Sequence, residues 1–180
     1  MKKTWICLMT LCLLLLPAAG LAAAQADLGR LALSVPEHLD LFTRRMQPDD
    51  PLLALYGTSA EQVARELSSK NLLMRAREIS GAYTITLSEK SDAGPDFSAL
   101  SDEELLAQKL SGQGNLDSEP ILRSGQAAFL VFRGRSTLSL VTRVAGTLYR
   151  LKLHAEGRIS GGMADSLRQM ARSMDFGRGQ

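Results

Sequence analysis

The stretch AAFLVFRGRSTLSLVTRVAGTLYRLKLHA, residues 127–155, decides the fold because it holds three strand patterns in direct succession. Residues 127–132 are apolar at every position, which is typical of a strand covered on both faces and predicts a central strand. Glycines at 134 and 146 mark the turns between the patterns. In the last pattern apolar and polar positions alternate, so one face holds Thr147, Tyr149, Leu151 and Leu153, and the other Leu148, Arg150, Lys152 and His154.

Shorter strand patterns precede this stretch along the chain. Further β patterns lie at 31–36, 39–45, 72–77, 83–88 and 120–124. The pair 72–77 and 83–88 is typical of a hairpin that turns near Ser80 and Gly81. We therefore expect a central, mainly antiparallel sheet of about six strands.

Helix signals separate these strands. YGTSAEQVARELSSKN, residues 56–71, offers two capping boxes, Thr58 with Glu61 or Ser59 with Gln62. LSDEELLAQKLSG, residues 100–112, begins with a Ser101 cap followed by acidic residues that favour a helix N-terminus. Together with the sheet, these helices predict an α+β fold with helices flanking the sheet.

A third helix is expected near the C-terminus, in GGMADSLRQMARSM, residues 161–174. Its apolar positions fall on one helical face. The stripe consists of Met163, Leu167, Met170 and Met174. A methionine-rich surface can bind partners, but burial of four such side chains is worth about 6–12 kcal/mol, so we interpret the stripe as core.

The N-terminus has the layout of a secretory signal peptide: Lys2 and Lys3, then an apolar run, then small residues. Cleavage is expected after Ala24, with a second A-x-A site ending at Ala26 as the alternative. This predicts a signal peptide at 1–24 and one domain at 25–180, exported to the periplasm, the cell surface or the medium. A membrane association would arise only through an uncleaved signal segment.

Both cysteines, Cys7 and Cys12, lie in that segment, so the expected mature chain has no disulfide and no cysteine metal site. Without Lys2 and Lys3 the chain has 19 basic and 19 acidic residues. The balance is uneven, with 9 basic against 16 acidic residues at 25–120 and 10 against 3 from residue 121 onward. A neutral exported domain does not favour nucleic-acid binding.

Catalytic patterns are absent from the sequence. It has no G-x-S-x-G or S-x-x-K motif, no H-E-x-x-H zinc motif and no glycine-rich phosphate motif, so we expect neither an enzyme nor a cofactor. The sequence places neither His38 nor His154 beside a serine, and His38 in PEHLD is interpreted as a loop histidine. A weak calcium site in the loop 92–96 is an alternative interpretation of its acidic residues.

The basic residues of the C-terminal half are the candidate binding site. For an anionic ligand or partner we single out Arg133, Arg143, Arg150, Lys152 and His154. The alternative is that the outward row of residues 147–154 is the solvated side of a strand.

The order of elements resembles the PsbP-like fold family. The matching pieces, in order, are LSVP (33–36), a capped helix, TITLSE (84–89), a second helix, and three strands ending in GTLYRLKLHAEG (146–157), then a helix closing with MARSMDF (170–176). The resemblance implies an α/β/α sandwich and a non-enzymatic accessory or docking role, and carries over no catalytic residue. Either the strand at 147–155 lies near a sheet edge, or its covering helix leaves the basic row in water.

From these observations we expect an exported, non-enzymatic accessory or interaction domain with an envelope protein as partner. The alternative function is a binding module for an anionic small molecule or an envelope polymer, through the basic strand face.

Overall fold

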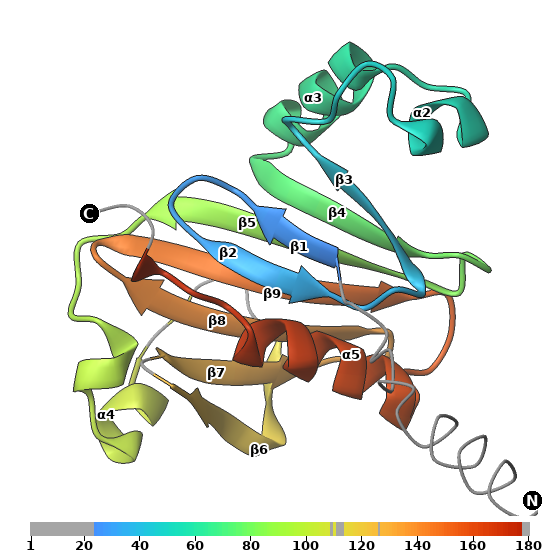
Figure 1. The fold of residues 1–180 in the computed structure, drawn as a ribbon. Helices are drawn as coiled ribbons and strands as arrows, with labels where there is room; N and C mark the ends of the chain where they lie inside the picture. Colours follow the sequence, from blue (N-terminus) through green and yellow to red (C-terminus); the bar gives the residue numbers. More distant parts are fainter. Residues whose placement is uncertain (1–23, 109, 111–113, 126, 178–180) are drawn as a thin grey trace, which may run out of the picture.

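The computed structural model describes residues 24–108, 110, 114–125 and 127–177 (Figure 1). The expected signal peptide therefore lies outside the described residues, except for Ala24, which begins the first strand. The strands are β1 Ala24–Asp27, β2 Ala32–Val35, β3 Leu39–Thr43, β4 Leu72–Glu78, β5 Tyr83–Ser91, β6 Asn115–Ser124, β7 Ala127–Arg133, β8 Thr137–Val144 and β9 Thr147–Ala155. The helices are α2 Pro51–Leu55, α3 Ala60–Ser69, the 3₁₀ turn η1 Phe97–Ala99, α4 Asp102–Leu106 and α5 Gly161–Arg172.

Seven strands form one sheet in the order β3-β4-β5-β9-β8-β7-β6, and every neighbouring pair is antiparallel. β1 and β2 form a separate two-stranded sheet. The expected fold class is confirmed, with seven strands in the main sheet where about six were expected.

One side of the sheet is covered by α5 and the β1–β2 pair, and we call it the α5 face (Figure 1). The inward row of β9 lies here, with Tyr149, Leu151 and Leu153 at most 4% exposed. Leu167 and Met170 of α5 are fully buried against it, and Met163 and Met174 pack at its margin. The methionine stripe is therefore part of the core, as expected.

The opposite side, which we call the open face, is covered only at its two ends. At the β7–β8 end, Phe97 of η1 and Leu105 of α4 are buried against β7 and β8. At the other end, Val63 and Leu67 of α3 and Leu53 of α2 pack around Phe42 of β3. The first cluster reaches the open-face row of β9 only at Leu148, and the rest of that row, Arg150, Lys152 and His154, is polar.

The sheet order corrects one expectation and decides another. β7 is buried on both faces, as its sequence indicates, but it lies next to the edge strand β6 and is not central. The central position belongs to β9, the fourth of the seven strands. The basic row of β9 therefore meets water because the helices leave it uncovered, and not because the strand lies at an edge.

Side-chain caps mark where the helices begin. Of the two possible capping boxes, Ser59 with Gln62 forms at α3. Ser101 with Glu104 caps α4, but that helix ends after five residues, shorter than the expected 100–112. α2 was not expected from the sequence; Asp50 caps it and a proline occupies its first turn, a combination that favours a helix start. Among the described residues, no helix is long and apolar enough to cross a membrane.

Candidate functional site: a basic sheet face and an arginine pocket

The five basic residues singled out from the sequence do not form one patch. Arg133 lies opposite Leu138, a core residue of the α5 face, so its side chain is on that side of the sheet. There its Nε lies 3.1 Å from Asp117 Oδ2, and Arg168 of α5 approaches the same carboxylate at 3.8 Å. Arg133 thus has a structural partner on the face opposite to Arg150.

Arg143 is on the open face but is not available to a ligand, since it is only 5% exposed. Its guanidinium donates to Asp92 Oδ2 at 3.0 Å and to the Pro95 carbonyl at 3.2 Å. It also lies 4.9 Å from the centroid of the Phe97 ring. Arg143 therefore fastens the loop 92–97 over β8.

The remaining three residues do come together. Arg150, Lys152 and His154 occupy the open-face row of β9, and their cross-strand neighbours on β5 are hydroxyl residues. The pairs are Arg150 with Ser88, Lys152 with Thr86, and His154 with Thr84. Lys152 and His154 are exposed and Arg150 is half-buried. Two of the five predicted residues are thus removed from the candidate site, and three stay in it.

The next strand, β4, extends this basic surface with two arginines that the sequence did not single out. Arg75 and Arg77 pair across the strands with Thr86 and Thr84. Arg75 Nη1 lies 2.7 Å from Glu66 Oε1, and Arg77 stacks 5.4 Å from the Tyr56 ring centroid. A hollow of about 410 Å³ opens beside them under α2 and α3. Its lining is Phe42, Tyr56, Thr58, Glu66, Arg75, Arg77, Gly81, Thr84 and Glu156.

Two acidic residues near this border have partners, while Glu156, which also lines the hollow, is exposed just after β9. Tyr56 donates to Asp40 Oδ2 at 2.6 Å, and that hydrogen bond raises the pKa of the tyrosine. The Lys70 ammonium is the main group that lowers the pKa of Glu66, and the neighbouring Arg75 acts in the same direction. Both carboxylates are therefore engaged at the α2–α3 side, away from the β9 row.

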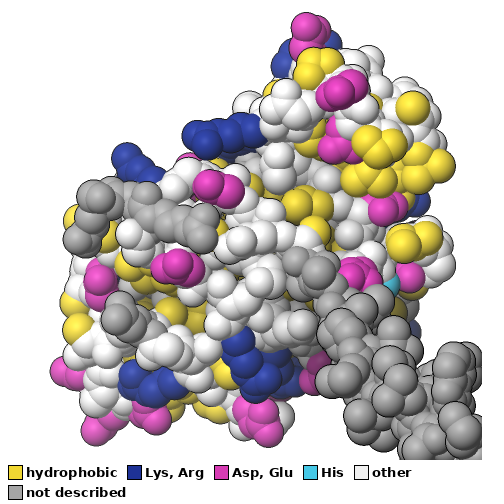
Figure 2. Space-filling model, in the orientation of Figure 1, with side chains coloured by type: hydrophobic (Ala, Val, Ile, Leu, Met, Phe, Trp, Pro, Cys, Tyr) yellow, Lys and Arg dark blue, Asp and Glu magenta, His cyan; other side chains and the backbone are white. Residues whose placement is uncertain are grey.

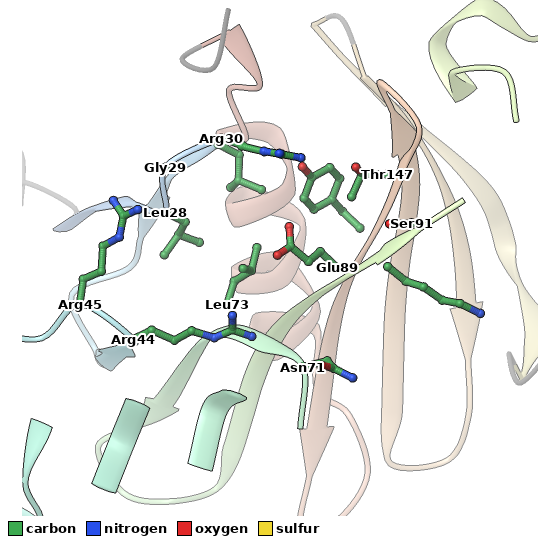
Figure 3. Close-up of a pocket in the computed structure, with 13 residues that line it drawn as sticks. Leu28, Gly29, Arg30, Arg44, Arg45, Asn71, Leu73, Glu89, Ser91 and Thr147 are labelled. Carbon is green, nitrogen blue, oxygen red and sulfur yellow. The ribbon is translucent and has the colours of Figure 1, made fainter. Parts of the chain in front are cut away.

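A second basic site lies on the α5 face, in a cavity of about 640 Å³ between the β1–β2 turn and the ends of β3, β5 and β9. We call it the arginine pocket (Figure 3). Its lining is Leu28, Gly29, Arg30, Leu31, Arg44, Arg45, Asn71, Leu73, Glu89, Lys90, Ser91, Thr147 and Tyr149. In Figure 2, Lys and Arg side chains gather at the upper left of the molecule, above the β1–β2 turn.

Three arginines line this cavity from two segments. Arg30 lies in the β1–β2 turn, and Arg44 and Arg45 follow β3. In Figure 3, Arg30 and Arg44 lie on opposite sides of the Glu89 carboxylate. Strand alternation places the side chain of Lys90 on the opposite face from Glu89, so Lys90 borders the pocket with its backbone.

Backbone contacts hold two of these arginines. Arg44 Nε donates to the Leu72 carbonyl at 2.6 Å, which leaves its two terminal nitrogens as donors. The Arg45 guanidinium packs over Gly29, where a Cβ would lie 3.3 Å from Nη2. Gly29 has a φ of +91°, a conformation that favours glycine, so the turn that carries Arg30 is fixed by that residue.

The floor of the pocket combines one carboxylate with one phenol. Glu89 on β5 and Tyr149 on β9 are directly opposite each other. Burial is the main cause that raises the pKa of Tyr149, Glu89 adds to it, and Arg30 acts against it. Tyr149 therefore keeps its proton at neutral pH. Within the described part of the chain, none of Arg30, Arg44 and Arg45 forms an ion pair.

One histidine is in a different environment from the one expected. His38 lies in the turn after β2, but its Nε2 is 2.7 Å from the Tyr83 hydroxyl and 3.2 Å from Ser166 Oγ. His38 is therefore a loop histidine, as interpreted, but it has a serine neighbour that the sequence did not indicate. Ser166 is buried on α5 and also hydrogen-bonds the Gly162 carbonyl at 3.1 Å. None of the three residues lines either pocket described above.

Metal ligands do not gather in the described ranges, where no group of three or more His, Cys, Asp or Glu side chains can hold an ion. In the loop 92–96, the carboxylate of Asp92 pairs with Arg143, and Asp96 accepts the Ala145 N–H at 2.8 Å. The acidic residues of this loop are thus used to dock it, which leaves the calcium interpretation without support from their geometry.

A scan against protein-family models and a search of curated proteins found no match to this chain. The site is therefore interpreted from its own chemistry: a basic, hydroxyl-lined sheet face on one side of the sheet, and a cavity with three arginines on the other.

Proposed function

We propose that the protein is an exported, non-enzymatic interaction domain that docks an extended acidic partner across its open face. The observation that supports this most directly is the sign of the charges. In the open-face rows of β4, β5, β8 and β9, every ionisable side chain is basic. Apart from Arg143, which is buried and paired with Asp92, they are Arg75, Arg77, Lys90, Arg150, Lys152 and His154.

The spacing of this row suits an extended chain. Alternate residues of a strand lie about 6.6–6.8 Å apart, so Arg150 to His154 spans about 13 Å. The hydroxyls of Ser88, Thr86 and Thr84 run parallel to it at the cross-strand distance of about 5 Å. An acidic chain lying along β9 would meet a basic side chain at each step and a hydrogen-bonding hydroxyl beside it.

The resemblance to the PsbP-like fold family is part of this proposal. It rests on the order of elements in the sequence and favours an accessory or docking role over catalysis.

The proposal of export rests on the N-terminal segment. Fractionation of cells that express the full chain with a C-terminal tag tests it: we expect the protein outside the cytoplasm, and deletion of residues 2–24 to retain it inside.

Binding of poly-glutamate at low ionic strength tests the docking surface. We expect the double variant Arg150→Glu with Lys152→Glu to bind at least about 10-fold more weakly and to lose most of the salt dependence. The matched control is Arg30→Glu with Arg44→Glu, which makes the same change of net charge on the other side of the sheet. Equal losses in both variants, or none in either, would refute the open face as the docking surface.

A second polymer separates the two functions expected from the sequence. Polyphosphate carries its charge on phosphate groups, as an anionic envelope polymer does, and poly-glutamate represents an acidic protein segment. Tighter binding of polyphosphate, sensitive to the same Arg150 and Lys152 reversal, would favour the polymer-binding alternative. Tighter binding of poly-glutamate would favour a protein partner.

A further inference from the structure

We infer that the arginine pocket is a binding site for a small phosphate monoester that carries hydroxyl groups, a ligand distinct from the partner of the open face. The pocket and the open face lie on opposite sides of the sheet, so either proposal can fail without the other.

The size and enclosure of the pocket suit a small molecule. Its volume of about 640 Å³ is within the range of about 300–1,000 Å³ typical of ligand sites. Strands β5 and β9 form its floor, and the β1–β2 turn forms one wall (Figure 3). The lining is mostly polar and charged, which favours a polar ligand over an apolar one.

The charge of the pocket points to a dianion. The lining contains three arginines and one glutamate, so it carries a net charge of about +2 when Arg and Glu are ionised. A guanidinium presents its donors in a planar fork that matches phosphate oxygens. With Nε of Arg44 already bonded to Leu72, its terminal nitrogens and those of Arg30 are the donors on the two sides of Glu89.

Glu89 explains why hydroxyl groups are part of the expected ligand. A carboxylate repels a bare anion, but it accepts hydrogen bonds from a hydroxyl group. It lies beside the phenol of Tyr149, which is protonated and can donate or accept. A phosphate between Arg30 and Arg44 would thus leave its polyol portion on Glu89 and Tyr149.

Titration calorimetry with sn-glycerol 3-phosphate and with inorganic phosphate, at low ionic strength, tests this. We expect the protein to bind glycerol 3-phosphate, and the Arg30→Ala with Arg44→Ala variant to bind it at least about 10-fold more weakly. Arg150→Ala with Lys152→Ala is the matched control and should keep its affinity. Absence of binding at millimolar concentration, or equal losses in the two variants, would overturn the proposal.

A separate variant tests the role of Glu89. Glu89→Gln removes the repulsion, so it should tighten inorganic phosphate and lower the preference for glycerol 3-phosphate over phosphate by about 10-fold. An unchanged preference would contradict the assignment of Glu89 to the hydroxyl groups.

If the arginine variants do not fold, the amide chemical shifts of the wild-type chain test the site instead. Glycerol 3-phosphate should change the amide shifts of residues 28–31, 89–91 and 147–149. Changes confined to other segments would overturn the site.

The phosphate ester could be soluble or the headgroup of a lipid. Sedimentation with vesicles that contain phosphatidic acid distinguishes these sources. Binding to vesicles with no calorimetric response to glycerol 3-phosphate assigns the pocket to a lipid headgroup, provided that Arg30→Ala with Arg44→Ala abolishes it. Vesicle binding that survives this variant counts against the pocket.

Discussion

Arg143 Nη2 donates to Asp92 Oδ2 at 3.0 Å across 51 residues of sequence, and this ion pair closes one end of the open face. The arginine side chain is 7% exposed and that of the aspartate 29% exposed. Because the pair is largely withdrawn from water, its loss leaves an unpaired carboxylate and a loop without its anchor. Arg143, which the sequence indicates as a candidate for binding an anion, is therefore a structural residue.

Arg143→Met should lower the free energy of unfolding by about 3 kcal/mol, because removal of one partner leaves a poorly solvated charge on the other. Urea denaturation followed by circular dichroism measures it. Arg135→Met is the control; Arg135 is exposed in the β7–β8 turn, so its loss should stay within about 0.5 kcal/mol. A loss below about 1 kcal/mol for Arg143→Met would show that Phe97 and the bond from Ala145 N–H to Asp96 hold the loop without the ion pair.

Gly94→Ala should destabilise the same region by about 1–3 kcal/mol, because an added Cβ would lie 2.6 Å from Arg143 Nη1. Gly157→Ala is the matched control, since a Cβ there would meet nothing within 4 Å. A double-mutant cycle with Arg143→Met should give a coupling of at least about 0.5 kcal/mol, because methionine relieves the clash. Additive effects would show that Gly94 is required for another reason.

The elements that the sequence predicted are those with a clear local signal. β9 alternates between buried and more exposed positions, α5 buries one face, and β7 is buried almost throughout, as its apolar run indicates. β1 and α2, of four and five residues, were both missed, whereas α4, equally short, was found through its Ser101 cap. The strand order was also beyond the sequence, because pairing of β5 with β9 depends on contacts about 60 residues apart.

The candidate site was predictable only where one strand carries it. The alternation of β9 correctly placed Arg150, Lys152 and His154 on one face. The same reasoning failed for Arg143, since the loop that buries it comes from about 50 residues earlier. The arginine pocket joins five separate segments, near residues 28–31, 44–45, 71–73, 89–91 and 147–149, and the sequence singled out none of its arginines.

Acid should weaken the fold partly through Asp117. Burial alone would raise the pKa of this carboxyl, but hydrogen bonds from Arg133 and from the Ser118 N–H outweigh it and hold the pKa below its ordinary value. A lowered folded-state pKa stabilises the protein above the unfolded-state pKa of about 3.9, and that stability is lost as the pH falls through the folded-state value.

The free energy of unfolding, measured from pH 7 to pH 3, should therefore fall less steeply in Asp117→Asn than in the wild type. The variant should also be less stable at pH 7, because Arg133 loses its partner. In Arg133→Gln the free energy of unfolding should also fall less steeply with acid, but the difference from the wild type should be smaller, since the Ser118 N–H still donates to Asp117. An Asp117→Asn slope equal to that of the wild type would rule out this contribution.

Ser166 tests the proposed absence of catalysis, because it is the one serine that His38 contacts within the described ranges. The contact has the components of a nucleophile and a base, but Ser166 is 7% exposed and its hydroxyl is also bonded to Gly162 and Tyr83. We expect a fluorophosphonate probe to leave the wild-type protein unlabelled at pH 8, under conditions that label a control serine hydrolase. Labelling that disappears in Ser166→Ala would identify a reactive serine and refute the non-enzymatic function; labelling equal in both proteins would point to another residue and refute it as well.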